Sequence, residues 1–443
     1  MLEYWGRRAG VPSFQHSTIA VFQFFRGDKT IMAIIVQKFG GTSVADAEKI
    51  RRAARRVIER RQAGYQVVVV ASARGQQTDE LVRDALELNP NPPKREMDQL
   101  LSTGEQQTVS LFAMALEAMG YKAISFTGGQ IRMMTDDVYS KAQIKSIDAD
   151  FIRGELNQDQ VVIVAGFQGI DEFGNITTLG RGGSDTSAVA LAAALKAEEC
   201  EIFTDVDGVY TTDPRIFKKA VRLDEISYDE MLELASLGAG VMHIRSVAFG
   251  KRYNVKIRVR NSGNDNPGTI ITHEVPQMEG VLVSGATIQK DMAKIGLIGV
   301  PNVPGMAAQV FARLAEAKVV VNDIIQTEIS PERANLSFMV GTSDLRTAKQ
   351  VADDLKEELR CESVFVRDDI ALVSVVGVGM RSQYGVAEKM FGALAKAKVN
   401  IDSITTSEIR ISCAVGKDEV ERALEAVCLA FELDKPARQR KPV

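Results

Sequence analysis

IIVQKFGGTS, residues 34–43, joins a short apolar run to a turn with two adjacent glycines. The run has the length of a buried strand, and residues 45–60 carry Ile and Ala side chains at helical spacing. The order of strand, glycine turn and helix indicates an α/β fold. Glycines at such a turn let backbone N–H groups approach an anion, and the start of the next helix favours negative charge. We therefore expect a phosphate site here.

Lys38 precedes the two glycines, where its ammonium group could reach bridging phosphate oxygens. A single lysine at a strand end is more often a solvated charge. Lys38 is therefore a candidate only in combination with a second anion-binding loop. The sequence contains neither G-x-x-x-x-G-K-[ST] nor G-x-G-x-x-G, so the turn is neither of those two nucleotide-binding loops.

A second loop of this kind is TTLGRGGSDTS, residues 177–187, which precedes an apolar stretch that reads as a buried helix through Lys196. Three glycines and the guanidinium of Arg181 suit a carboxylate or a phosphate, which arginine binds in a bidentate manner. The alternative is a plain glycine-rich turn with a Ser or Asp helix cap. Such a cap does not require Gly-Arg-Gly-Gly, so we favour an anion site that Arg181 and Lys38 share.

Two more stretches of this half carry charged and hydroxyl side chains at expected element boundaries. In REMDQLLSTGEQ, residues 95–106, Glu105 follows a Ser-Thr-Gly turn at the expected start of a helix. The alternative for Glu105 is an acid that only stabilises the first turn of that helix. In TDVDGVYTTDPR, residues 204–215, acids, hydroxyls, an aromatic ring and an arginine follow a strand. Loops at strand ends are where α/β sheets bind ligands.

Composition places the chain among soluble globular proteins. It has 443 residues, 45% of them hydrophobic and 25% charged, and a net charge of −4, which allows two or three domains and disfavours nucleic acid as a partner. Its four cysteines show neither metal nor redox spacing, which fits a reducing cytoplasm. No apolar run reaches the roughly 18 residues that cross a bilayer, so we expect no membrane partner. We expect residues 1–31 to be a dispensable extension, or an overcalled start ahead of Met32.

Short β-rich runs alternate with helical stretches as far as about His273, which predicts a largely parallel sheet. The strands expected after the first are residues 67–71, 123–126, 161–165, 201–204, 256–259 and 269–272. Beyond a linker the chain repeats itself, because FARLAEAKV at 311–319 matches FGALAKAKV at 391–399. Modules of about 70 residues are small, so we expect the two copies to support each other or to pair across chains.

Taken together, four motifs in this order carry a resemblance to a known family. Residues 38–43, 101–106, 180–186 and 204–215 resemble aspartate kinase, which has the amino-acid kinase fold, and the repeat resembles the tandem ACT domains of that family. The resemblance runs from Met32 to about Leu433. It implies an α/β fold in which a three-layer α/β/α sandwich is followed by two ferredoxin-like ACT domains.

The resemblance also implies the domain limits. They are an extension at 1–31, a catalytic domain at 32–275, a linker at 276–290, a first ACT domain at 291–365, a second at 366–435 and a tail at 436–443. The sequence HIR at 243–245 is expected on a packing helix of the catalytic domain.

The activity implied is transfer of the γ-phosphoryl group of ATP to the β-carboxylate of L-aspartate, the first step towards lysine, threonine, methionine and diaminopimelate. A carboxylate nucleophile is already ionised at pH 7, so the reaction requires no general base, and the sequence shows none. Mg²⁺ would be held mainly by the nucleotide phosphates, and no side chain is assigned as a metal ligand. What remains for the protein is positioning and charge neutralisation.

Residue roles follow from the resemblance, with Glu105 receiving the α-ammonium of the substrate and Arg181 its α-carboxylate. The catalytic residues are Lys38, Arg181 and Asp205. The substrate-binding residues are Ser72, Thr78, Asp79, Thr103, Glu105, Arg181, Gly182, Gly183 and Ser184. The nucleotide-binding residues are Lys38, Phe39, Gly40, Gly41, Thr204, Asp205, Tyr210 and Arg215.

The repeat is expected to bind an amino-acid effector, lysine, threonine or both, and to assemble the chain as a homo-oligomer. The effector-binding residues expected are Asn302, Val320, Val321, Asn322, Gln326, Asn400 and Ile401. Four alternatives stay open: glutamate 5-kinase, acetylglutamate kinase, uridylate kinase, and a non-catalytic amino-acid-sensing regulatory protein. The Ser-Thr-Gly-Glu run and the paired modules speak against the first three, and the intact loops that carry Lys38 and Arg181 speak against the fourth.

Overall fold

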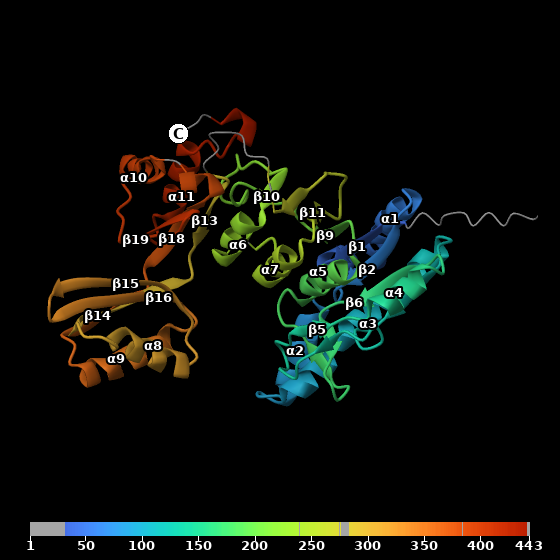
Figure 1. Cartoon of the computed structure of the whole chain (residues 1–443), viewed down its shortest axis with the longest axis horizontal. Helices are drawn as coiled ribbons and strands as arrows, with labels where there is room; N and C mark the ends of the chain where they lie inside the picture. The colour runs from blue at the N-terminus through green and yellow to red at the C-terminus, as the bar shows by residue number, and fades with distance from the viewer. Residues whose placement is uncertain (1–31, 239, 274, 276–282, 383, 441–443) are drawn as a thin grey trace, which may run out of the picture. The chain divides into compact units, whose positions relative to one another are not determined.

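The computed structural model describes residues 32–238, 240–273, 275, 283–382 and 384–440 (Figure 1). Residues 1–31, which the sequence predicts to be dispensable, lie outside the described residues. No helix in the described ranges is both long enough and apolar enough to span a membrane.

An eight-stranded sheet forms the centre of the first half, with strand order β10-β12-β11-β9-β1-β2-β6-β3. All of its pairs are parallel except β11 with β12. The strands are β1 (Ile34–Phe39), β2 (Gln66–Ala71), β3 (Ala123–Phe126), β6 (Val161–Ala165), β9 (Glu199–Thr204), β10 (Glu225–Ser227), β11 (Ile257–Asn261) and β12 (Thr269–Thr272). The prediction of a largely parallel α/β sheet is therefore confirmed.

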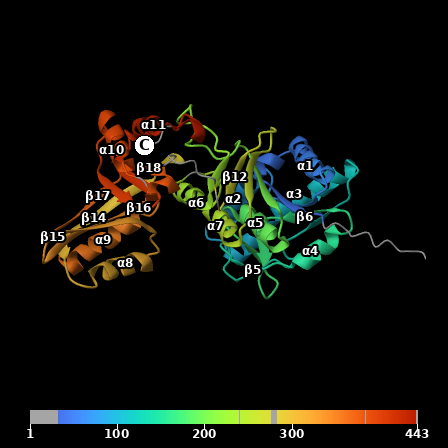
Figure 2. The ribbon, with the colours of Figure 1, turned by 45° about the horizontal axis from the view of Figure 1, so that its top comes forward.

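Helices cover both faces of this sheet, because its central strands are continuous apolar runs whose successive side chains point to opposite faces. In β2, Val67 and Val69 pack with α1 (Ala47–Gln62) and α3 (Lys94–Ala118). Val68 and Val70 pack with the helices of the other face. Those helices are α4 (Ala149–Leu156), α5 (Gly183–Leu195), α6 (Tyr228–Ser236) and α7 (Ile244–Tyr253). The result is the predicted α/β/α sandwich (Figure 2).

A small second sheet lies beside the sandwich, with strand order β5-β4-β7-β8. Its strands are β4 (Met134–Thr135), β5 (Ile144–Ser146), β7 (Gln168–Ile170) and β8 (Ile176–Thr178). The last strand, β8, leads directly into the loop that carries Arg181, which we call the arginine loop.

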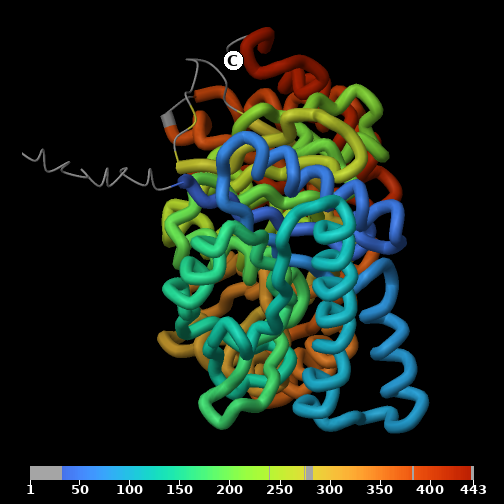
Figure 3. The backbone as a smooth tube through the Cα atoms, turned by 90° about the vertical axis from the view of Figure 1, so that its right-hand side faces the viewer, coloured from blue at the N-terminus to red at the C-terminus, as the bar shows by residue number. Residues whose placement is uncertain are grey.

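Two further elements lie near the start of the chain. Helix α2 (Gln77–Leu88) packs along α3 (Figure 3). The glycine turn after β1 forms a short 3-10 helix, η1 (Gly41–Val44).

The predicted helix start next to Glu105 is wrong. Residues 102–104 form no turn, because they lie inside the 25-residue helix α3. Gly104 serves a close approach instead: a β carbon there would lie 2.7 Å from the β carbon of Ala73. The glycine therefore lets α3 pack against the loop that follows β2, and it does not form a turn ahead of a helix.

The repeat forms two modules, each with a four-stranded antiparallel sheet covered by two helices. The first module comprises β14 (Met292–Pro301), α8 (Met306–Glu316), β15 (Val321–Ser330), β16 (Arg333–Gly341), α9 (Leu345–Leu359) and β17 (Ser363–Arg367). The second comprises β18 (Ile370–Val376), η2 (Val378–Ser382), α10 (Val386–Lys396), β19 (Ser403–Thr406), β20 (Arg410–Gly416) and α11 (Val420–Ala430). A last 3-10 turn, η3 (Ala437–Gln439), follows. Both ferredoxin-like folds agree with the sequence prediction.

The fourth strand of the second module comes from the segment that the sequence predicts as a linker. Residues 276–282 of that segment lie outside the described residues, but β13 (Gly285–Gln289) pairs antiparallel with β18, with Gln289 opposite Leu372. All seven residues of β18 are buried, so this edge requires a partner strand. The first module is thus inserted between β13 and the rest of the second.

Glu230, on α6 of the first half, binds groups of the second module. One carboxylate oxygen accepts hydrogen bonds from the Ser284 hydroxyl at 2.5 Å and from the Val378 N–H at 3.1 Å. The other oxygen accepts from Ser227, which caps the start of α6. Glu230 is only 3% exposed, so this carboxylate is a buried connection, and each of its two oxygens has hydrogen-bond partners.

Candidate active site

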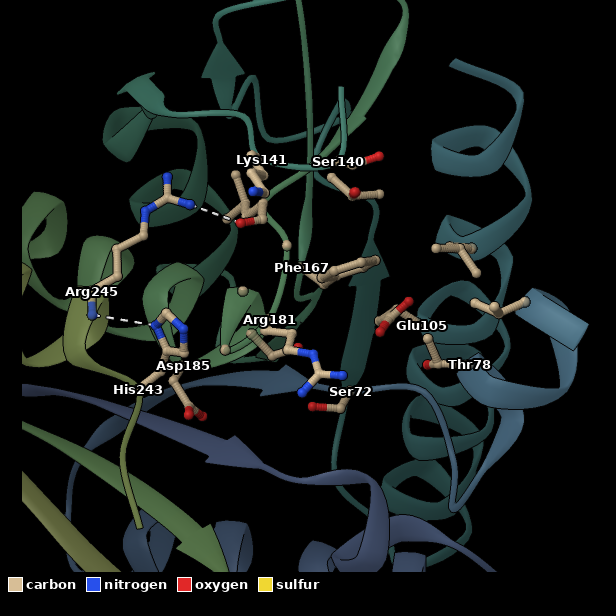
Figure 4. A pocket seen from close by; sticks show the side chains of 18 of the residues that line it. Ser72, Thr78, Glu105, Ser140, Lys141, Phe167, Arg181, Asp185, His243 and Arg245 are labelled. Carbon is tan, nitrogen blue, oxygen red and sulfur yellow. Dashed lines mark hydrogen bonds between the residues drawn. The ribbon is translucent and has the colours of Figure 1, made fainter. Parts of the chain in front are cut away.

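A cavity of about 1100 Å³ opens where β1, β2 and β6 end and α5 begins (Figure 4). Many predicted substrate residues lie together there. Its lining includes Lys38, Ser72, Thr78, Asp79, Glu105, Arg181, Gly182, Gly183 and Ser184. Carboxyl ends of parallel strands and the start of a helix meet at this point, which is where open α/β sheets bind ligands.

Lys38 lies at the end of β1 and forms an ion pair with Asp185, with 2.5 Å between Nζ and Oδ1. Both side chains are largely buried, at 12% and 14% exposed. Asp185 stands in the first turn of α5, where the helix dipole stabilises an acid. Lys38 is therefore fixed at the cavity, with a carboxylate beside it.

Glu105 is a buried carboxylate with one oxygen in use. Its Oε1 accepts a hydrogen bond from the Ala73 N–H at 3.0 Å, and its Oε2 is buried without a hydrogen-bond partner among the described residues. Burial raises the pKa of Glu105 to about 7, against the lowering effect of the Ala73 hydrogen bond. A carboxylate in this state gains a partner when a cation such as an ammonium group enters the cavity.

The arginine loop needs its glycines for close contacts. Gly180 has φ +77°, and a β carbon there would lie 2.7 Å from the Ser140 carbonyl oxygen. Gly182 has φ +67°, and a β carbon there would lie 2.3 Å from that of His243. Arg181 stands between these two contacts and extends towards Ser72 and Glu105 (Figure 4).

Several predicted nucleotide residues come together beside the cavity, since β1 and β9 are parallel neighbours. The Gly40 N–H donates to the Phe203 carbonyl oxygen at 3.2 Å, so Gly40 lies next to Thr204 and Asp205. Gly41 packs against the Ala73 carbonyl oxygen, which a β carbon would approach to 2.7 Å.

Eight of the predicted substrate and nucleotide residues do not line the cavity: Gly40, Gly41, Thr204 and Asp205, which lie beside it, and Phe39, Thr103, Tyr210 and Arg215. Phe39 is fully buried and stacks on Phe203 with 4.7 Å between ring centroids. The Thr103 hydroxyl donates to the Leu100 carbonyl oxygen within α3. Tyr210 forms an isolated β-bridge with Arg222. Arg215 is 89% exposed and pairs with Asp213 at 2.7 Å.

Sequence reasoning missed several residues of the cavity. Residues 243–245 do begin a packing helix, as predicted, but His243 and Arg245 also line the cavity, together with Ser140, Lys141 and Phe167. A histidine and an arginine two residues apart at the start of a helix were the available signal. Asp98 is the other omission: this fully buried carboxylate binds the loop that carries Ser140.

The predicted effector residues fall at matching places in the two modules. Val320 precedes β15, and Asn400 precedes β19, each an edge strand of its sheet. Val320 is 67% exposed, whereas Asn302 is held by its N–H to the Glu332 carbonyl oxygen. The remaining ones, Val321, Asn322, Gln326 and Ile401, lie in β15 or just ahead of β19.

Comparison with known families identifies all three parts of the chain. Residues 33–261 match the amino acid kinase family, and residues 297–360 and 373–431 each match the ACT domain. The aspartate kinase Ask_LysC of Stutzerimonas stutzeri is 48% identical over 92% of this chain and 99% of its own length. The aspartokinase of Thermus thermophilus is 47% identical over 91% of this chain and 100% of its own length.

Solved structures agree in fold as well as in sequence. Escherichia coli aspartokinase III in complex with aspartate and ADP has a TM-score of 0.74 and 27% identity, covering 90% of this chain and 99% of that one. The same enzyme in complex with lysine and aspartate has a TM-score of 0.70 at 27% identity, over 90% of this chain and 99% of that one. The kinase domain precedes the two ACT domains, and the relatives are matched over nearly their full length. This chain therefore belongs to the aspartokinase family.

Proposed function

We propose that this chain transfers the γ-phosphoryl group of ATP to the β-carboxylate of L-aspartate, giving 4-phospho-L-aspartate and ADP. The observation that carries the proposal is the presence, in one cavity, of the guanidinium of Arg181 and of the buried carboxylate of Glu105, whose Oε2 has no hydrogen-bond partner among the described residues. An α-amino acid presents an ammonium and a carboxylate on one carbon, which suits such a pair.

Each end of the substrate then has a partner. Glu105 receives the α-ammonium and Arg181 the α-carboxylate, with Ser72, Thr78 and Asp79 completing the acceptor side of the cavity. The β-carboxylate is left free to attack phosphorus. It is ionised at pH 7, so no residue has to remove a proton.

Lys38 and the backbone of Gly40 and Gly41 would hold the transferring phosphoryl group. The ion pair with Asp185 keeps the Lys38 ammonium oriented before the nucleotide arrives. Charge neutralisation by a positioned cation is the main catalytic aid in phosphoryl transfer.

When bound with the nucleotide, Mg²⁺ would neutralise negative charge on the phosphates. The described residues hold no group of three or more metal-ligating side chains. This donor set fits an ion that takes one or two carboxylates at most and completes its coordination with phosphate and water. Asp205, exposed at the end of β9 next to Gly40, would be the side chain available to it.

The two modules would bind an amino-acid effector and pair chains into a homo-oligomer. A relative of known structure was solved in complex with lysine. The edge strands β15 and β19, where the predicted effector residues gather, leave backbone groups free for a partner strand. We propose the same domain limits as the sequence predicts, except that β13 belongs to the second module.

A coupled ADP-release assay tests the proposal. We expect turnover with L-aspartate, little or none with L-glutamate or N-acetyl-L-glutamate, and inhibition by lysine, threonine or both. Equal turnover with a glutamate acceptor would identify a different amino-acid kinase. The absence of turnover with all three acceptors, in a folded protein that binds lysine, would favour a regulatory protein.

A further inference from the structure

Both terminal nitrogens of the Arg245 guanidinium donate hydrogen bonds to backbone carbonyl groups next to the arginine loop. Nη1 donates to the Leu179 carbonyl oxygen at 2.7 Å (Figure 4), and Nη2 donates to that of Ala142 at 2.6 Å. Within the described residues, no carboxylate lies within ion-pair distance of Arg245. A half-buried arginine whose bonds all go to main chain fixes the position of that main chain.

Asp98 holds the same two segments from α3. Its Oδ2 accepts from the Thr178 N–H at 2.7 Å and from the Ser140 N–H at 2.9 Å. Its Oδ1 accepts from the hydroxyls of Thr178 at 2.8 Å and Ser140 at 3.3 Å. The two segments also bond to each other, because the Ala142 N–H donates to the Thr178 carbonyl oxygen at 2.9 Å. Residues 140–142 and 178–179 are therefore held together by an anion and a cation.

Arg181 follows this fixed pair by two residues. Gly180 rests on the Ser140 carbonyl oxygen, and Gly182 rests on the ring-bearing β carbon of His243, two residues before Arg245. The backbone on either side of Arg181 thus contacts segments that Arg245 or its helix holds. A shift of these segments would move the Arg181 guanidinium relative to Glu105.

We infer that Arg245 is a positioning residue for Arg181 and so sets the affinity for the carboxylate-bearing acceptor. The identity of that acceptor as L-aspartate rests on the proposed function. Arg245 lines the cavity together with the predicted substrate residues, and its side-chain hydrogen bonds to described residues go to Leu179 and Ala142, neither of which is a predicted nucleotide residue, so we expect its effect to fall on the acceptor.

The test compares Michaelis constants in two variants of the full chain. Arg245→Met removes both hydrogen bonds, and we expect the Michaelis constant for aspartate to rise by about tenfold to a hundredfold while that for ATP changes less than about twofold. Arg245→Lys keeps the charge but can reach one carbonyl, so we expect an intermediate value. In thermal melts, the stabilisation that L-aspartate provides should fall while that provided by ADP persists.

Arg153→Met is a matched control. Arg153 also donates to two backbone carbonyl groups, those of Ala194 at 3.4 Å and Leu195 at 3.1 Å, but at the far end of α5. Both Michaelis constants should stay at wild-type values in this variant. An aspartate Michaelis constant unchanged in folded Arg245→Met, or raised equally with that for ATP, would overturn the inference.

Should Arg245→Met fail to fold, Arg245→Lys decides by the same criterion. Failure of the proposed function looks different: the wild-type chain would then phosphorylate another carboxylate acceptor. The inference would be tested on that acceptor with the same variants.

Discussion

At the scale of single residues, Glu105 ties the chemistry of the cavity to pH. Its carboxyl group gives up a proton near pH 7 instead of near 4.5, because burial disfavours the charged form. Substrate ammonium requires the charged form. Aspartate affinity should therefore fall as pH decreases below about 7.

Glu105→Gln removes this charge. We expect the Michaelis constant for aspartate to rise by about tenfold or more, with little change for ATP, and the pH dependence of aspartate affinity between 6 and 8 to disappear. Glu117→Gln, on the exposed face of the same helix, is the control. Initial rates across this pH range check both statements, and an unchanged aspartate constant would contradict the role of Glu105.

The same substitution should increase the free energy of unfolding, although it weakens aspartate binding. A carboxyl whose pKa is raised by folding contributes stability that is present below the unfolded pKa of about 4.5 and lost as pH rises through about 7. Without ligand at pH 8, Glu105→Gln should thus be more stable than wild type, by on the order of 1–3 kcal/mol, and the difference should vanish towards pH 4. Denaturant melts at the two pH values measure it.

The roles of the two charges in the Lys38–Asp185 ion pair can be distinguished by mutating each residue. Lys38→Met should lower kcat by about 10²–10³ with an intact fold, since it removes a cation from the transferring phosphoryl group. It also leaves Asp185 unpaired beside the phosphates. The double variant with Asp185→Asn should therefore recover ATP affinity but not kcat. Wild-type turnover in Lys38→Met would remove the lysine from the mechanism.

At the scale of elements, the start of α5 depends on a glycine for two reasons. Gly182 has a positive φ, and its position also excludes a β carbon because of His243. Gly182→Ala should therefore cost more than the roughly 1–2 kcal/mol of a left-handed alanine and should also weaken aspartate binding. Urea melts and aspartate kinetics measure the two effects.

Gly64 offers the matched comparison. It has φ +90° with nothing within 4 Å of an added β carbon, so Gly64→Ala carries the backbone cost alone. Aspartate kinetics should be normal in this variant. If the two alanine variants behaved alike, the contact with His243 would have no part in shaping the loop.

Elements show what the sequence could predict. Local patterns were enough for the strands at residues 123–126, 161–165 and 269–272, which the structure has with the same bounds. Gly104 misled because a glycine in a turn ahead of a helix and a glycine that admits a neighbouring Ala73 look the same in sequence. Arg245 and Asp98 were missed for a similar reason, since their partners are backbone and hydroxyl groups far along the chain.

At the scale of the whole molecule, β13 makes the second module discontinuous. The repeat in the sequence could not predict this, because a short strand far from its partner carries no signal beyond its own five residues. Replacing residues 292–369 by Asn-Gly joins β13 to β18 as a two-residue hairpin, because continuing the register of Gln289 with Leu372 places Asp291 opposite Ile370. We expect that variant to stay soluble and to melt cooperatively.

Deletion of residues 283–369 removes β13 as well. The buried strand β18 then has an open edge, so this variant should aggregate. Size-exclusion chromatography of the two deletion variants compares them. Similar solubility would show that β13 contributes little to the second module.

The separation of β13 from β18 along the chain also sets an order of assembly during synthesis. β13 leaves the ribosome first, and residues 290–369 must all be translated before β18 emerges to meet it. The first module can close in that interval on its own contacts. A chain whose translation stops before β18 therefore carries β13 without its partner strand. The second module can be completed only after translation of the whole chain.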